Sequence, residues 1–187
     1  SEMCIRDRYR TNAQSRLLEE RFVRENIPYK IVGGVNFYAR KEIKDLLCYL
    51  KTIDNAQDDL AVKRIINVPK RGIGATTIAK VQDYADENGM SFYAALRQAE
   101  EISTLSKATA TKIRPFVTFI QMLRSKLPYI SVEQLMDEII EDTGYVAELD
   151  AEGTDEARAR IENIDELISK IVAYEESVEQ PTLSGFL

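Results

Sequence analysis

The chain has 187 residues and a net charge of −6, and 44% of its residues are hydrophobic. These values are typical of one globular domain, or of one domain with part of a second. The sequence contains no histidine, which excludes Ser-His-Asp and Cys-His catalysis and every histidine-containing metal site. No apolar run approaches the ~20 residues of a membrane span, so we expect a soluble protein with no membrane partner. Cys4 and Cys48 form no disulfide framework or metal motif, which favours a reducing cytoplasm.

Residues 1–8 show no periodicity that agrees with the sequence after them, and we interpret them as a foreign leader. The segment 9–55 is predicted to form a small, partial α/β layer. Its first helix should end near Asn26, because Pro28 favours an extended conformation in the residue before it. The alternating residues 27–32 predict a strand, and a lone strand needs sheet partners from outside this chain.

A second helix is predicted from Arg40 to about Ile53, because apolar residues recur there at helical spacing. Glu42 and Asp45 lie between lysines in this helix and are predicted to be part of a solvated face. The polar run 54–59 that follows is the expected boundary between two parts of the chain.

The remaining residues, 56–187, are predicted to contain helices only, so the expected fold class is mainly α. Apolar periodicity and capping residues indicate where these helices begin and end. Pro115 predicts a kink, or a helix start, inside one of them. An acidic loop is expected over 150–155. The helices are expected over 75–88, a short stretch after Ser91, 108–127, 131–144 and 157–178.

Charge divides the chain into two unequal parts. Residues 131–187 hold 16 Asp or Glu against 3 Lys or Arg, whereas residues 1–130 carry a net charge of +7. Only the first part therefore favours contact with nucleic acid. The acidic part is interpreted as a solvated surface, with a partner-protein surface as the alternative.

A basic, glycine-rich turn from Val68 to Gly74 runs directly into the helix that begins at Ala75. Glycines allow a tight turn, and the free amides and positive dipole end of the helix start suit a phosphate. We predict contacts to the DNA backbone without base reading, and the alternative is an ordinary helix–helix corner. The predicted DNA-binding residues are Lys70, Arg71, Gly72, Ile73, Gly74, Thr76 and Thr77.

The turn and its flanking helices resemble a helix-hairpin-helix element, which holds the nucleic-acid backbone. The helix before the turn has an apolar end with Leu60, Ile65 and Ile66. The helix after the turn is expected to direct Ile78, Val81 and Ala85 inward.

Four motifs occur in order along the chain, at Tyr9–Arg16, Val32–Asp45, Asn67–Gly74 and Arg160–Leu167. Together they resemble the UvrD/PcrA/Rep-type superfamily 1 DNA helicases, and most of all the PcrA helicases of Gram-positive bacteria. The first motif resembles helicase motif IV, and the third resembles the duplex-contacting Gly-Ile-Gly motif of the family. The joint match is highly specific, although each motif alone would be weak.

The resemblance implies that 9–55 is the first part of the RecA-like 2A subdomain and that 56–187 is the all-helical 2B subdomain inserted into it. In the family, the motif IV tyrosine packs near the adenine and its arginine reaches the γ-phosphate. This implies nucleotide-binding roles for Tyr9 and Arg10 in an intact enzyme. ATP and Mg²⁺ would be the cofactors of that parent enzyme. Duplex DNA and the remaining helicase subdomains would be the partners of this chain.

The sequence departs from the family in the motifs that it lacks. It contains no phosphate-loop motif and no acidic Mg²⁺-binding motif. We therefore expect no catalytic or metal-binding residue and no bound cofactor in this chain, and neither ATP hydrolysis nor DNA unwinding by it. DNA-stimulated ATPase activity of the purified chain would contradict this expectation.

The favoured hypothesis is a fragment of an ATP-dependent 3′–5′ DNA helicase of the bacterial cytoplasm, acting in DNA repair or replication, whose 2B subdomain binds duplex DNA. The alternative is a regulatory, protein-interaction module that modulates helicase activity. Phe37 is expected to pack, although Phe37 and Arg40 could instead line a single-strand path. Arg160 and Asn163 are expected to tie the last helix to a neighbour through hydrogen bonds to backbone.

Overall fold

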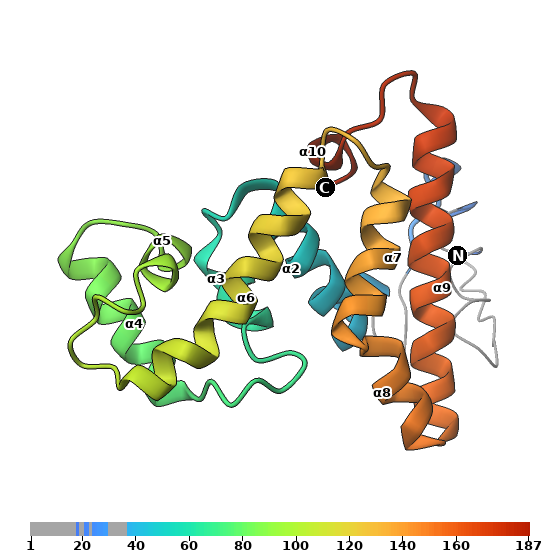
Figure 1. Cartoon of the computed structure of the whole chain (residues 1–187). Helices are drawn as coiled ribbons and strands as arrows, with labels where there is room; N and C mark the ends of the chain where they lie inside the picture. Colours follow the sequence, from blue (N-terminus) through green and yellow to red (C-terminus); the bar gives the residue numbers. More distant parts are fainter. Residues whose placement is uncertain (1–17, 19–20, 23, 30–36) are drawn as a thin grey trace.

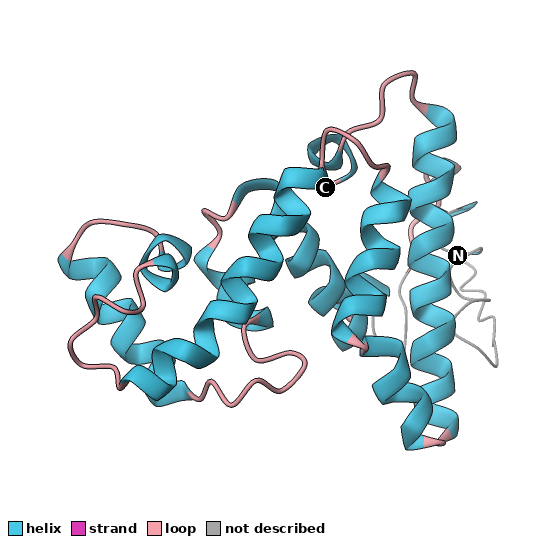
Figure 2. Cartoon of the chain, in the orientation of Figure 1, coloured by secondary structure: helices cyan, strands magenta, loops and turns pink. Residues whose placement is uncertain are grey.

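The structure, a computed structural model, describes residues 18, 21–22, 24–29 and 37–187. Within these ranges every regular element is helical, and Figure 2 shows helices joined by loops with no strand among them. No helix in the described ranges is both long and apolar enough to cross a membrane. The elements from residue 37 onward are η1 (Phe37–Ala39), α2 (Lys41–Asn55), α3 (Asp59–Ile65), α4 (Ala75–Glu87), α5 (Phe92–Arg97), α6 (Lys107–Lys126), α7 (Val132–Thr143), α8 (Tyr145–Glu152), α9 (Asp155–Ser177) and α10 (Leu183–Phe186).

The predicted α/β layer has no counterpart in the described residues. Ile27, Pro28 and Tyr29 form no strand, and the rest of the predicted strand lies outside the described residues. The helix before it does end as expected, because Asn26 has a φ of +53°, in the left-handed region that stops a helix. The proposed leader, 1–8, also lies outside the described residues.

Helix α2 is the centre of the fold. It packs against α3 and α6 on one side of the molecule and against α7 and α9 on the other, and Figure 1 shows these two groups flanking it. The predicted apolar stripe of α2 is confirmed, because Ile43, Leu46 and Leu50 are fully buried. Phe37, in η1, is buried as well, which confirms its packing role.

Glu42 and Asp45 correct the expectation of a solvated face on α2, because they are 4% and 1% exposed. Asp45 Oδ1 accepts a hydrogen bond from Arg64 Nε at 2.7 Å, and Asp45 Oδ2 accepts one from the Tyr145 hydroxyl at 2.9 Å. A carboxylate with a charged partner and a hydroxyl donor offsets the desolvation that burial imposes. Asp45 thereby connects α2 to α3 and to α8.

Asn163 makes a comparable connection between α2 and α9. Its Nδ2 donates to Glu42 Oε1 at 2.7 Å, and its Oδ1 accepts from Arg40 Nη1. The expected tie to a neighbouring element is therefore present, but it reaches side chains and not backbone. Arg160 pairs with Glu156 on its own helix at 2.7 Å, so the expectation that it reaches a neighbour is wrong.

The predicted helix ends agree closely with the structure. Ser131 and Gln134 form a reciprocal capping box at the start of α7, and Gly144 closes that helix with a φ of 64°. Pro115 lies inside α6, which runs through it from Lys107. The expected acidic loop is mostly helix, because α8 continues to Glu152. Gly144 is both the C-cap of α7 and the N-cap of α8. Because no polar loop separates the two helices, the sequence contains no local signal for the start of α8.

Three buried tyrosines predict that the fold loses stability in alkali. Burial raises the pKa of Tyr49, Tyr93 and Tyr145 above the ordinary value of 10.0, and at Tyr145 the neighbouring Asp45 carboxylate raises it further. As pH rises past about 10, the unfolded chain therefore loses these protons before the folded chain does. We expect the free energy of unfolding to fall above pH 10, by up to about 1.4 kcal/mol per pH unit for each such tyrosine.

Urea denaturation between pH 8 and 11.5 measures this effect. Tyr145→Phe should reduce the slope above pH 10, because phenylalanine has no proton to lose. Tyr129→Phe is the matched control, since Tyr129 is 85% exposed. A pH dependence that is unchanged by Tyr145→Phe would contradict the prediction.

Candidate nucleic-acid interface

The side chain of Asn67 organises the turn between α3 and α4. Its Oδ1 accepts from the backbone N–H of Arg71 at 2.7 Å and of Ile73 at 3.3 Å. Gly72 lies between these two residues with a φ of 69°, a backbone conformation that residues with a side chain rarely adopt. Sequence reasoning missed Asn67, although the known tendency of asparagine to bond nearby backbone amides was an available signal.

Arg71 lies differently from the expected phosphate-binding cation, because its guanidinium points into the protein. Nη1 donates to the carbonyl oxygens of Ile65 at 3.0 Å and of Val68 at 3.0 Å, and Nη2 donates to the Tyr49 hydroxyl at 2.7 Å. The guanidinium carbon also lies 5.2 Å from the centre of the Phe116 ring. Arg71 thus caps the end of α3 and holds the turn against α2 and α6.

The other predicted site residues divide into buried and exposed groups. Ile73 is 1% exposed, so its side chain anchors the turn in the core and offers only backbone to a ligand. Thr77 is half-buried, and its N–H bonds the Gly74 carbonyl at 3.0 Å. The exposed members are Lys70, Gly72, Gly74 and Thr76.

The start of α4 is open to a ligand. Gly74 is its N-cap and carries no side chain that could accept from the first turn. In the described part of the chain, the N–H groups of Ala75 and Thr76 have no hydrogen-bond acceptor. The arrangement therefore presents free amides at the positive end of a helix of 13 residues.

Lys112 joins this surface from α6, although it lies 40 positions away from Gly72. Its Nζ is 3.5 Å from the position that a Cβ at Gly72 would occupy. Lys112 is exposed and has no carboxylate partner in the described residues. Sequence reasoning missed it, because nothing in the local sequence of a long helix shows which turn it approaches. We call Lys70, Gly72, Gly74, Ala75, Thr76 and Lys112 together the hairpin surface.

The two helices beside the turn confirm most of the expected inward residues. Ile65, Ile66, Val81 and Ala85 are fully buried, and Ile78 is partly buried against the core. Leu60, at the start of α3, is 79% exposed. Asp58 caps α3 by accepting from the Ala61 N–H at 3.0 Å, and the buried residues of this helix are Ala61, Val62 and Ile65. The short helix α5 contacts both α3 and α4.

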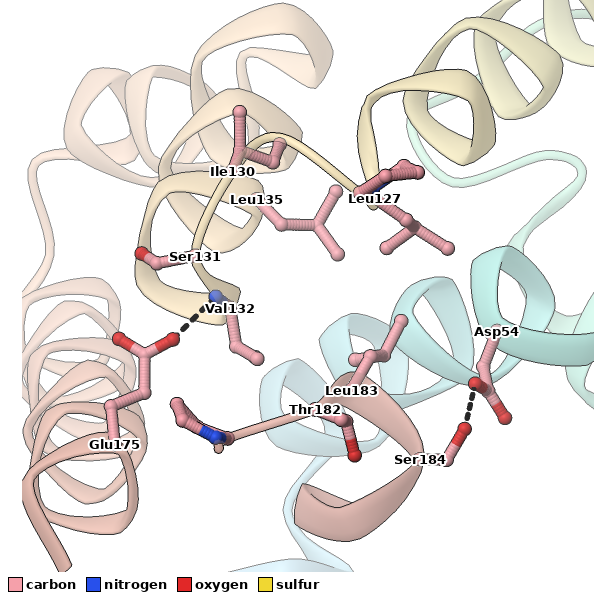
Figure 3. A pocket seen from close by; sticks show the side chains of 12 residues that line it. Asp54, Leu127, Ile130, Ser131, Val132, Leu135, Glu175, Thr182, Leu183 and Ser184 are labelled. Atoms are coloured by element: carbon pink, nitrogen blue, oxygen red, sulfur yellow. Dashed lines mark hydrogen bonds between the residues drawn. The ribbon is translucent and has the colours of Figure 1, made fainter. Parts of the chain in front are cut away.

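A pocket of about 460 Å³ lies elsewhere, where the loop between α6 and α7 meets α10 (Figure 3). Its acidic groups have partners within the protein. Glu175 accepts from the Val132 N–H at 2.5 Å, and Asp54 accepts from the Ser184 hydroxyl. Among the described residues no cluster of His, Cys, Asp or Glu could hold a metal ion. Both carboxylates therefore connect elements of the protein: Glu175 connects α9 to the start of α7, and Asp54 connects α2 to α10.

The proposed nucleotide-binding residues, Tyr9 and Arg10, lie outside the described residues, so their predicted roles stay predictions. The structure brings Lys112 of α6 to Gly72, and the other members of the hairpin surface are exposed neighbours of Gly72 in the sequence. The chemistry of the hairpin surface consists of two lysine ammonium groups and free backbone amides, which are donors for an oxyanion.

Comparison with known proteins supports the resemblance that the four sequence motifs indicate. The family described as UvrD-like helicase C-terminal domain matches residues 8–186. The ATP-dependent DNA helicase PcrA of Staphylococcus aureus strain Mu50 is 47% identical over 181 residues, which cover 96% of this chain and 25% of that relative. The PcrA of Staphylococcus epidermidis strain RP62A is 47% identical over 189 residues, with 100% and 26% covered. The chain spans about a quarter of the length of these relatives. Because the family match extends over nearly all of its residues, the chain belongs to the UvrD-like helicase C-terminal domain family.

Proposed function

We propose that this chain is the part of an ATP-dependent DNA helicase that binds the backbone of duplex DNA, without sequence specificity, through the hairpin surface. The observation that carries the proposal is the meeting of Lys112 with Gly72 beside the open start of α4. Two mobile positive charges and a set of fixed amides suit successive phosphates of a backbone and make no contact with base edges. The relatives named above are ATP-dependent DNA helicases, which supports the choice of ligand.

The residues of the turn have separate roles in this proposal. Lys70 and Lys112 contact phosphates as charges, while the amides of Ala75 and Thr76 donate to a phosphate at the start of α4. The hydroxyls of Thr76 and Thr77 add donors at the same place. Arg71 acts as a positioning residue, since its donors are used inside the protein.

The wider assignment follows the family. Residues 9–55 belong to a RecA-like 2A subdomain and residues 56–187 to a helical 2B subdomain with a helix-hairpin-helix character. Tyr9 and Arg10 contribute to an ATP and Mg²⁺ site that the other helicase subdomains complete. The parent enzyme works in the bacterial cytoplasm, in DNA repair or replication, and this chain by itself hydrolyses no ATP.

The double substitution Lys70→Ala and Lys112→Ala tests the hairpin surface. Fluorescence anisotropy with a labelled 20-base-pair duplex, measured at several salt concentrations, gives affinity and salt dependence together. Loss of two phosphate contacts should weaken binding and make the slope of log affinity against log salt shallower by about 2. Duplexes of different sequence should be affected equally, because phosphate contacts carry no base information.

Arg158→Ala is the matched control, because Arg158 is an exposed arginine of α9, in the acidic part of the chain. It should leave both affinity and salt slope unchanged. If the control lowers affinity as much as the double substitution does, the chain attracts DNA by net charge alone and the hairpin assignment fails.

A further inference from the structure

A second pocket, of about 400 Å³, lies between the end of α2, the start of α5 and the second half of α6. Its lining contains two arginines and no carboxylate. Around them are a serine, a tyrosine and two glutamines, so the surface of the pocket is rich in hydrogen-bond donors. The polar residues of the lining are Gln57, Ser91, Tyr93, Arg97, Gln121 and Arg124. We call this the arginine pocket.

The arginines of this pocket differ from most others in the described part of the chain. Arg64, Arg114 and Arg160 each form an ion pair with a carboxylate. Arg97 and Arg124 have no ion pair with any described residue, although Arg124 is half-buried. Two guanidinium groups therefore share a pocket in which the described protein supplies no negative charge.

Both arginines line the same pocket as the buried Tyr93. Burial raises the pKa of the Tyr93 phenol, and the charges of Arg124 and Arg97 both oppose that rise. Arg97 comes from α5 and Arg124 from α6, so two separate elements direct charge toward the same side chain. The phenol itself donates to the Val117 carbonyl at 3.4 Å and stays neutral. No carboxylate lines this pocket, so an anion that enters it meets two guanidinium groups without an ion-pair partner among the described residues.

We propose that the arginine pocket binds a phosphate group between the side chains of Arg97 and Arg124. A guanidinium fork matches the geometry of phosphate oxygens better than any other side chain does. Gln57 and Gln121 supply amide donors. The Ser91 oxygen accepts from the Ala94 N–H, and this bond leaves the hydroxyl hydrogen of Ser91 available to donate to a ligand. The phosphate belongs to a polynucleotide strand or to a free nucleotide, since both present the same oxyanion.

This site is separate from the hairpin surface. Arg124 lies 12 positions along α6 from Lys112, which corresponds to about 18 Å of helix. At about 100° per residue, the two side chains also leave the helix roughly 120° apart. The inference therefore does not rest on the proposed function, and each can fail without the other.

Nuclear magnetic resonance of the ¹⁵N-labelled chain tests the proposal by following the arginine Nε–Hε signals. Inorganic phosphate, AMP and an eight-residue oligothymidylate without terminal phosphate are titrated separately. Saturable shifts of the Arg97 and Arg124 signals are expected with inorganic phosphate and AMP. Shifts that saturate at lower concentration with the oligonucleotide would assign the site to a strand, and stronger shifts with AMP would assign it to a nucleotide.

Arg97→Gln and Arg124→Gln should each raise the dissociation constant about tenfold, because each removes charge-assisted hydrogen bonds. Arg114→Gln is the matched control, since it makes the same charge change on α6 and Arg114 lies outside the pocket. The dispersion of the NMR signals reports whether each variant is folded. Gln57→Ala provides a second test of phosphate binding at a position that is exposed. Absence of saturable shifts, or an equal loss with Arg114→Gln, would overturn the proposal. The Lys70→Ala and Lys112→Ala variant should keep these shifts even if it loses duplex binding.

Discussion

Replacing Arg71 by methionine is expected to lower the free energy of unfolding by roughly 3 kcal/mol. The guanidinium donates to the carbonyls of Ile65 and Val68 and to the Tyr49 hydroxyl, and methionine would keep the packing against Phe116 while removing these charged donors. A half-buried acceptor that loses a charged donor costs more than the net value of an ordinary hydrogen bond. Urea denaturation followed by circular dichroism measures the loss.

Arg71→Lys separates a positioning role from a phosphate-contacting role. Lysine keeps the charge but has no planar fork, so it should recover little of the lost stability. Lys70→Ala, one position earlier and exposed, should leave stability unchanged and weaken duplex binding. If Arg71→Met unfolds at the same urea concentration as the unmodified chain, the inward guanidinium contributes nothing and Arg71 returns to the list of candidate phosphate contacts.

Asp45→Ala is expected to destabilise the chain by about 3 kcal/mol or more. The carboxylate is 1% exposed and is the acceptor for both Arg64 and Tyr145. Removing it leaves the buried Tyr145 hydroxyl without its acceptor and leaves Arg64 with the Lys41 carbonyl as its acceptor, at the point where α2 is connected to α3 and α8. Thermal or urea denaturation would show the loss as a lower midpoint.

Lys44→Ala is the control for this substitution, because Lys44 is the neighbouring residue of α2 and is exposed. Tyr145→Phe should cost less, about 1 kcal/mol, since it removes one hydrogen bond and leaves the Arg64 pair intact. If the Asp45→Ala variant is as stable as the control, the buried hydrogen bonds of Asp45 make no net contribution to the free energy of unfolding.

Local signals predicted the helices well, and they could not predict which helix faces are covered. Ser131, Gly144 and the apolar stripe of α2 act within a few residues, so the sequence was sufficient for them. Glu42 and Asp45 are polar and next to lysines, and only the packing of α3, α8 and α9 around α2 buries them. Their burial depends on residues up to 121 positions away, beyond any local pattern.

The candidate site was predicted in part for the same reason. The glycine-rich turn and the helix start at Ala75 are local features, and the structure has both. The side-chain directions within the turn are not local. Arg71 turns inward because Tyr49 and Phe116 offer it partners, and Lys112 reaches Gly72 from a different helix. A basic residue in a turn is therefore weak support for a ligand contact until its own partners are known.

The separation of charge along the chain is also a separation in space. Helices α7, α8 and α9 lie together on one side of α2 (Figure 1), and residues 131–187 carry 16 acidic against 3 basic side chains. Residues 37–130 carry 15 basic against 10 acidic side chains. The molecule therefore has a large electric dipole moment, and a nearby polyanion exerts a torque on it before contact. The torque biases rotational diffusion, so that the molecule approaches the polyanion with its basic helices facing it and its acidic helices facing away.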